Sequence, residues 1–207
     1  MGYVLYGDKG SGAFCVEAAL AQAGAEYEFH TVSLERNDQK SPDFLAVNPS
    51  GKLPALKLPS GEIVTETVAL LLTIAERHPE AALLPSDHAQ ALRWIAFLAS
   101  EVYPMVEIYD YPTRFVPEGE AAEALKRKAL ERVRERMLVV ERAVAGPWLL
   151  ESGFSAADLY VAMFSRWQEC RLDGWREAHL PKICAIATAL SQRPSITAVW
   201  KSHFPKG

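Results

Sequence analysis

The sequence has few cysteines and no long apolar run. It contains three cysteines, Cys15, Cys170 and Cys184, without a C-x-x-C pair or ligand-like spacing. An odd number of this kind argues against a disulfide framework and favours a reducing compartment, so we expect a cytoplasmic protein. The longest apolar stretch, Thr67–Ala75, is half of the roughly 18 residues that a membrane span needs. The first residues also lack the basic and apolar regions of a signal peptide.

The sequence also lacks a basic surplus. Against 26 Asp and Glu it has 22 Lys and Arg, a net charge of -4, so bulk charge favours neither nucleic acid nor an anionic membrane as partner. The glycines of the segment GDKGSG do not follow the G-x-x-x-x-G-K-[ST] spacing of a phosphate-binding loop. We expect no metal site, because the five histidines are scattered without ligand spacing: His30, His78, His88, His179 and His203.

The first 78 residues alternate short apolar runs with helical patterns, which is typical of an α/β unit. Helical spacing of apolar residues predicts helices, and Ser41 followed by Pro42 has the composition of a helix start. Pro59-Ser60-Gly61 separates two strand-sized runs and predicts a hairpin. The expected strands are 3–6, 27–32, 55–58 and 62–64, and the expected helices are 13–23, one beginning at Ser41, and 65–77.

The second half is predicted to be a helical bundle. Apolar stripes at helical spacing run through residues 92–102 and 125–144. Ser155 and Asp158 have the S-x-x-D spacing of a capping box, so we interpret them as structural. The predicted organisation is therefore an α/β domain at 1–78, a linker at 79–88 where prolines interrupt the pattern, and an all-helical domain at 89–207.

The segment Val47–Ala75, VNPSGKLPALKLPSGEIVTETVALLLTIA, carries the clearest chemical information. A proline at the entrance of a strand cannot donate to the ladder, so Leu53-Pro54 leaves the backbone N–H and C=O of Leu53 free for a ligand. Downstream, Glu66-Thr67 opens a helix directly after a strand, which places free N–H groups, a hydroxyl and the positive helix end at one point. A small peptide-like ligand with an anionic end fits both features.

These motifs resemble those of the cytosolic glutathione transferase family. The resemblance rests on x-N-P-x-G-K-x-P-A-L at Val47–Leu56, on Glu66-Thr67, and on GPWLLESGFSAADLYVA at Gly146–Ala162, and it covers essentially the full chain. It implies a thioredoxin-like N-terminal domain, a helical C-terminal domain and a homodimer. It also implies a cis peptide before Pro54, pairing of Leu53 with the cysteinyl part of glutathione, and contact of Glu66 and Thr67 with its γ-glutamyl end.

The resemblance further implies that a Tyr, Ser or Cys near the start of the first helix stabilises the glutathione thiolate. The candidates are Tyr6, Ser11 and Cys15. Alignment on the A-x-A-G that closes this helix puts Ser11 and Gly12 at the position of the key residue of bacterial members, with Cys15 about one turn too deep. Tyr6 belongs to the strand itself. We therefore predict Ser11 as the donor, with the first backbone amides of the helix as the alternative.

The remaining site predictions concern the glycine carboxylate of glutathione and the electrophilic substrate. For the glycine carboxylate of glutathione, the available cations are Lys40, Lys52 and Arg36. An aromatic wall in the first bundle helix predicts a site between the domains for a hydrophobic electrophile, formed by Tyr103, Tyr111 and Arg114. The predicted activity is conjugation of glutathione, as cosubstrate, to such an electrophile. A glutathione-dependent disulfide or peroxide reductase and a non-catalytic binding module of the same fold remain alternatives.

Overall fold

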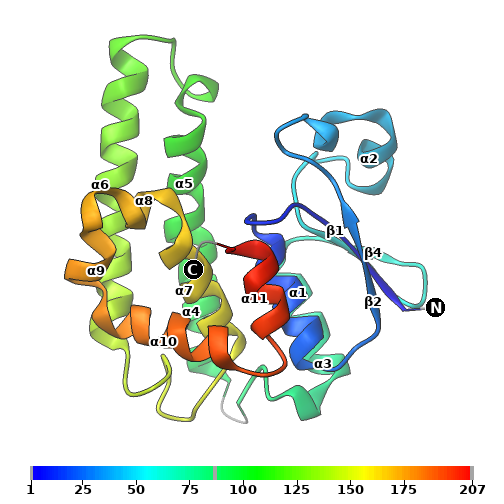
Figure 1. Cartoon of the computed structure of the whole chain (residues 1–207). Helices are drawn as coiled ribbons and strands as arrows, with labels where there is room; N and C mark the ends of the chain where they lie inside the picture. Colours follow the sequence, from blue (N-terminus) through cyan, green and yellow to red (C-terminus); the bar gives the residue numbers. More distant parts are fainter. Residues whose placement is uncertain (1, 86–87, 206–207) are drawn as a thin grey trace. The chain divides into compact units, whose positions relative to one another are not determined.

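The computed structural model describes residues 2–85 and 88–205, which form two compact units (Figure 1). The first unit consists of the chain up to Pro85 together with the chain from Ala189 onward, and the second ends at Thr188. No helix within the described ranges is both long and apolar enough to cross a membrane. The sequence therefore folds as an α/β unit completed by the C-terminal helix and a separate helical unit.

A mixed sheet with the strand order β2-β1-β3-β4 forms the centre of the first unit. β1 is parallel to β2 and antiparallel to β3, and β3 is antiparallel to β4. This arrangement confirms the thioredoxin-like fold class expected from the sequence. The strands are β1 (Tyr3–Gly7), β2 (Tyr27–Thr31), β3 (Ala55–Lys57) and β4 (Ile63–Val64).

Helices cover both faces of this sheet. The residues of β1 are alternately buried and half-buried, so neither face of this strand is fully exposed. On one face, α1 (Ala13–Gln22) packs between α3 (Thr67–Arg77) and α11 (Thr197–His203), as Figure 1 shows. On the other face, α2 (Pro42–Val47) contributes Phe44 to a cluster that includes Tyr6. Ser41 caps α2 by accepting a hydrogen bond from the Phe44 N–H at 3.2 Å, which confirms the predicted helix start.

The last helix of the first half begins later than expected. The sequence predicts a helix over 65–77, whereas α3 begins at Thr67. Glu66 has extended backbone angles, φ −103° and ψ 163°, so the chain runs on from β4 before it turns into the helix. This displacement puts Thr67 at the first position of α3.

The second unit is helical, as the sequence predicts. A π-helical turn, Leu98–Val102, links α4 to α5, and α5 packs against the long helix α6. The capping box at the start of α7 is confirmed, since Asp158 Oδ2 accepts the Ser155 N–H at 2.8 Å. The helices are α4 (Ala89–Phe97), α5 (Tyr103–Asp110), α6 (Glu120–Ala143), α7 (Ala156–Arg166), α8 (Gln168–Arg171), α9 (Trp175–His179) and α10 (Pro181–Gln192).

The compact units differ from the predicted domain boundaries at the C-terminus. Helix α11, expected within the helical domain 89–207, belongs to the first unit, where Phe14 of α1 contacts the rings of Trp200 and Phe204 at centroid distances of 5.5 and 5.0 Å. Residues 86–87 of the predicted linker 79–88 lie outside the described residues. The division into 1–78, 79–88 and 89–207 stays a prediction.

Candidate functional site

One edge of the sheet in the first unit brings the sequence-predicted binding residues together. In the antiparallel register of β1 with β3, Tyr6 lies opposite Ala55, so Gly7 and Pro54 flank these strands at the same end of the sheet. In the register of β3 with β4, Val64 lies opposite Leu56, so Glu66, which follows β4, also lies at this end. The turn into α1, the start of β3 and the start of α3 therefore meet at this edge.

The start of β3 presents an open backbone. The Leu53-Pro54 peptide is cis, as predicted, and Pro54 is buried. Leu53 is half-buried against the cluster of α2 and the sheet. Among the described residues, neither the N–H nor the C=O of Leu53 has a hydrogen-bond partner. An extended peptide can therefore pair with this residue without displacing a neighbouring strand.

The start of α3 is an uncapped helix N-terminus. Thr67 is buried, Glu66 is exposed, and the side chain of Glu66, the N-cap residue, makes no capping hydrogen bond to the first turn. The Glu66 C=O accepts the Leu70 N–H at 2.9 Å, so the backbone of Glu66 accepts the first hydrogen bond of the helix. The Thr65-Glu66 peptide is also cis. The side chains of Glu66 and Thr67 do not act as helix caps, which leaves the amides of this turn for an anion.

The turn before α1 is tied down by its own side chains. Ser11 Oγ donates to the Asp8 C=O at 2.7 Å and accepts the Ala13 N–H at 3.2 Å. The carboxylate of Asp8 accepts the Leu34 N–H at 2.8 Å, which fixes the turn to the loop after β2. Gly12 is buried, and within the described part of the chain its N–H has no acceptor. Buried amides normally have an acceptor, so this N–H can donate a hydrogen bond to a ligand.

The two other thiolate-donor candidates are a buried and a half-buried packing residue. Cys15 is fully buried in α1, and burial raises the pKa of its thiol well above the ordinary value, as expected of an inert helix residue. The ring of Tyr6 lies 5.1 Å from the His30 ring and 6.2 Å from the Phe44 ring, on the α2 face of the sheet. Tyr6 is thus a packing residue on the face opposite α1.

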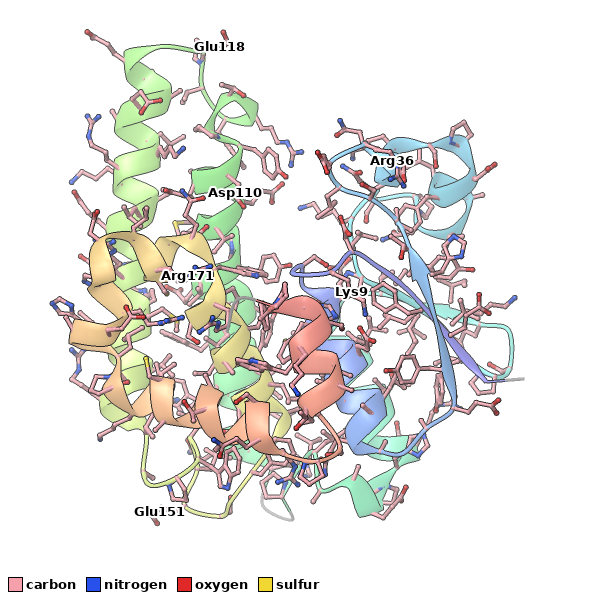
Figure 2. The ribbon with its side chains drawn as sticks, in the orientation of Figure 1. Lys9, Arg36, Asp110, Glu118, Glu151 and Arg171 are labelled. Carbon is pink, nitrogen blue, oxygen red and sulfur yellow. The ribbon has the colours of Figure 1, made fainter. Side chains whose placement is uncertain are left out.

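The three candidate cations differ in their surroundings. Arg36 is exposed on the loop between β2 and α2 (Figure 2) and donates to Asp38 Oδ2 at 2.7 Å. Lys40 reaches the loop that precedes β3, since a Cβ added to Gly51 would stand 2.7 Å from its Nζ. The Lys52 backbone is held in the same loop, where its C=O accepts the Asn48 side-chain amide at 2.8 Å. Lys40 and Lys52 therefore belong to one loop cluster beside Leu53.

The predicted electrophile-binding residues lie in the second unit, and they do not form one cluster. Tyr111 and Arg114 are exposed, and the guanidinium carbon of Arg114 lies 3.9 Å from the centroid of the Tyr111 ring. Tyr103 lies at the start of α5, with its ring in edge-to-face contact with Phe164 and Trp167 at 5.5 and 5.4 Å. Tyr103 is thus half-buried in an aromatic cluster, whereas Tyr111 and Arg114 form an exposed surface pair.

Sequence reasoning missed three supporting residues of this site. Asp8 anchors the turn before α1, Asn48 closes the loop before Leu53, and His203 accepts the Gly10 N–H at 3.0 Å. Asp8 and Asn48 stand in turn-type sequences that signal local hydrogen bonds. Nothing in the sequence links His203 to a turn 193 residues away. No group of three or more acidic, cysteine or histidine side chains in the described ranges is arranged to hold a metal ion.

Comparison with known proteins agrees with this geometry. Residues 1–76 match the family model "Glutathione S-transferase, N-terminal domain". The chain is 29% identical over 203 residues to the uncharacterised GST-like protein YncG of Escherichia coli K12, covering 96% of this chain and 97% of that protein.

Solved structures show the same likeness. A glutathione transferase homologue from Sulfitobacter, solved with bound glutathione, superposes with a TM-score of 0.88 at 31% identity and covers 95% of this chain and 96% of that chain. The beta-class glutathione S-transferase of Sphingomonas chungbukensis superposes with a TM-score of 0.79 at 30% identity, covering 97% of this chain and 98% of that chain. Both likenesses extend across nearly the full length of each protein.

Proposed function

The chain belongs to the glutathione S-transferase family, and from this premise we propose that it conjugates glutathione to a hydrophobic electrophile. The observation that carries the proposal is the open backbone of Leu53, which lies between the start of α1 and the start of α3. Such an edge suits a short extended peptide with one anionic end and one reactive thiol. Glutathione, γ-glutamyl-cysteinyl-glycine, has this chemistry.

In the proposed complex, glutathione lies along this edge in extended form. Its cysteinyl N–H and C=O pair with the backbone of Leu53 next to the cis-Pro54. The α-carboxylate of the γ-glutamyl residue lies at the start of α3, where Thr67 and the first amides donate to it. The Glu66 carboxylate takes the α-amino group of the same residue. Each hydrogen-bonding or charged group of the γ-glutamyl-cysteinyl part then has a partner of complementary hydrogen-bonding character or opposite charge.

The reaction requires the thiol of glutathione as a thiolate. A free cysteine thiol has a pKa of about 8.5, and lowering this by about 2 units takes roughly 2.7 kcal/mol of preferential stabilisation of the anion. The unpaired Gly12 N–H and the N-terminus of α1 supply part of it. Ser11 supplies the rest when its hydroxyl turns from the Asp8 carbonyl to the sulfur. Proximity of the two reactants then completes the catalysis.

The glycine carboxylate of glutathione and the electrophile also need binding residues. The glycine carboxylate of glutathione goes to Lys40 or Lys52, because Arg36 is already engaged by Asp38. We assign the hydrophobic electrophile to the exposed pair of Tyr111 and Arg114 after α5, because Tyr103 packs in the aromatic cluster with Phe164 and Trp167. We also infer a symmetric homodimer through the stripe of residues 92–102, which light scattering at micromolar concentration tests.

A glutathione titration followed by two activity assays tests the proposed function. Calorimetric binding together with turnover of an aromatic halide supports a transferase. Turnover of a glutathionyl mixed disulfide alone assigns the protein to reductases instead. Binding without either turnover identifies a non-catalytic module, and absence of binding contradicts the whole proposal.

A further inference from the structure

A buried histidine of the C-terminal helix holds the turn before α1. His203 lies on α11, and its side chain is completely buried. Its Nδ1 accepts the Gly10 N–H at 3.0 Å, and its Nε2 lies 2.7 Å from Glu17 Oε2. Because Nδ1 accepts, the ring proton of the neutral imidazole is on Nε2 and is donated to Glu17. The tautomer thus follows from the two partners.

Glu17 connects this histidine to the same turn by a second route. Lys9 Nζ donates to Glu17 Oε2 at 2.6 Å and lies 3.6 Å from the centroid of the Phe29 ring. The other carboxylate oxygen of Glu17 accepts the Tyr27 hydroxyl at 3.2 Å. Figure 2 shows Lys9 where the turn, α1 and α11 meet. The turn is therefore fastened at Lys9 and at Gly10, immediately before Ser11.

The hydrogen bond at Gly10 acts on the backbone that leads to Ser11 and Gly12. Gly10 has φ +81°, a left-handed conformation that sets the direction in which the chain enters α1. The next two residues carry the groups assigned to the thiolate, the Ser11 hydroxyl and the Gly12 N–H. A hydrogen bond at Gly10 fixes the place of both donors. We expect loss of that bond to leave Leu53 and Thr67 in place, because they lie on other elements, before β3 and at the start of α3.

We propose that His203 is a positioning residue, whose neutral imidazole holds Gly10 so that the Ser11 hydroxyl and the Gly12 amide meet the glutathione sulfur. This inference rests on the proposed function. His203 touches no substrate and acts through the turn. The C-terminal helix thereby controls the reactivity of the thiol but not the affinity for the peptide part of glutathione.

The arrangement makes the turn sensitive to acid. Burial lowers the pKa of His203, and the hydrogen bond to Glu17 offsets only part of this, so the ring is neutral near pH 7. Protonation would put a hydrogen on Nδ1 against the Gly10 N–H, and the contact would become repulsive. The charged and titratable groups that face the ring are Glu17 of α1, Lys9 and Asp8 of the turn, and Tyr27 of β2 behind Glu17.

Two substitutions separate the two hydrogen bonds of His203. In His203→Asn the side-chain oxygen occupies the place of Nδ1, so the bond from Gly10 is retained and the donor to Glu17 is lost. In His203→Gln the amide nitrogen takes the place of Nε2, so the bond to Glu17 is retained and the acceptor for Gly10 is lost. The exposed His179→Gln serves as a control for the general effect of replacing a histidine.

The readouts are hydrogen exchange of the Gly10 amide in the ligand-free protein, glutathione affinity, and kcat and KM across pH. We expect His203→Gln to speed Gly10 exchange at least tenfold and to lower kcat about tenfold with KM for glutathione within twofold. His203→Asn should recover most of both quantities. In the wild type, the protection of the Gly10 amide against exchange should fall as pH drops through the lowered pKa of His203, whereas in His203→Asn it should not, since an amide side chain does not titrate.

Failure of the positioning role of His203 and failure of the proposed function give different results. Equal losses in His203→Asn and His203→Gln, or a change in neither, overturn the positioning role. A rise in KM without a fall in kcat also overturns it, because that would place the effect on binding. If the wild type shows no conjugation, the proposed function fails, and Gly10 exchange alone then decides whether His203 holds the turn.

Discussion

The side-chain amide of Asn48 donates to the backbone C=O of Lys52 at 2.8 Å, across the loop that leads into Leu53 and cis-Pro54. Asn48 Oδ1 also accepts both the N–H and the hydroxyl of Ser50, at 3.2 and 3.0 Å. One buried side chain thus closes the whole N-P-S-G-K segment. The backbone of Leu53 is therefore held in place before a peptide binds.

Replacement of Asn48 by Ala should destabilise the protein by about 1–3 kcal/mol, because it leaves buried backbone groups of the loop without partners. It should also raise KM for glutathione. Urea unfolding and steady-state kinetics measure both effects. Ser50→Ala removes only the hydroxyl bond to the same oxygen, so a loss as large as that of Asn48→Ala would contradict the loop-closing role.

Replacement of Thr67 by Ala should weaken glutathione binding by about 1.5–3 kcal/mol, roughly tenfold to a hundredfold, because it removes a donor to a carboxylate. The fold should remain intact, since the Thr67 side chain caps nothing in α3. Calorimetry measures the affinity, with Thr73→Ala on the same helix as control. Equal affinity of Thr67→Ala and wild type would remove Thr67 from the site.

Replacement of Asp158 by Ala should destabilise the second unit by about 3 kcal/mol. Its carboxylate accepts the Leu149 N–H at 2.7 Å and the Ser155 N–H at 2.8 Å in a fully buried site, so both donors would be left unsatisfied. Ser155→Ala, which removes only a hydroxyl, should cost about 1 kcal/mol. Denaturant unfolding of the two variants checks this order, and a reversed order would contradict the interpretation.

Burial, helped by the nearby Asp110, raises the pKa of Glu169 from its ordinary value to about 7. A carboxyl with a raised pKa favours the protonated folded state, so its contribution to stability is complete below about pH 4.5 and is lost as pH rises through 7. Glu169→Gln removes this pH dependence. The unfolding free energy of the variant minus that of the wild type should therefore be larger at pH 8 than at pH 5, by about 3 kcal/mol. Thermal unfolding of this variant and of the exposed Glu151→Gln (Figure 2) tests it; equal behaviour of the two would refute it.

Much of the fold can be predicted from the sequence because its signals are local. Ser41-Pro42 starts α2, Pro59-Ser60-Gly61 joins β3 to β4, and Ser155 with Asp158 starts α7, each through contacts within a few residues. The packing of α11 on α1 could not be predicted in this way. It depends on ring contacts such as Phe14 with Trp200, between residues far apart in the chain, and apolar periodicity does not specify partners.

The candidate site divides along the same line. Leu53, Pro54 and Thr67 follow from proline and helix-start chemistry, and the structure brings them to one edge of the sheet. Tyr103, Tyr111 and Arg114 could not be resolved into core and surface, because an aromatic residue on a helix has the same pattern in both roles. His203 required the tertiary structure, since its two partners lie near the opposite end of the chain.

The pKa of the thiol of bound glutathione tests the central claim most directly. Titration of the thiolate by its ultraviolet absorbance in the saturated wild-type complex should give a value about 2 units below the roughly 8.5 of a free thiol. Ser11→Ala should move the value part of the way back, and Cys15→Ala should leave it unchanged because that residue is buried away from the ligand. A bound thiol that titrates at the free value in the wild type would contradict the account, and a loss of the shift in Tyr6→Phe instead of Ser11→Ala would transfer the role to Tyr6.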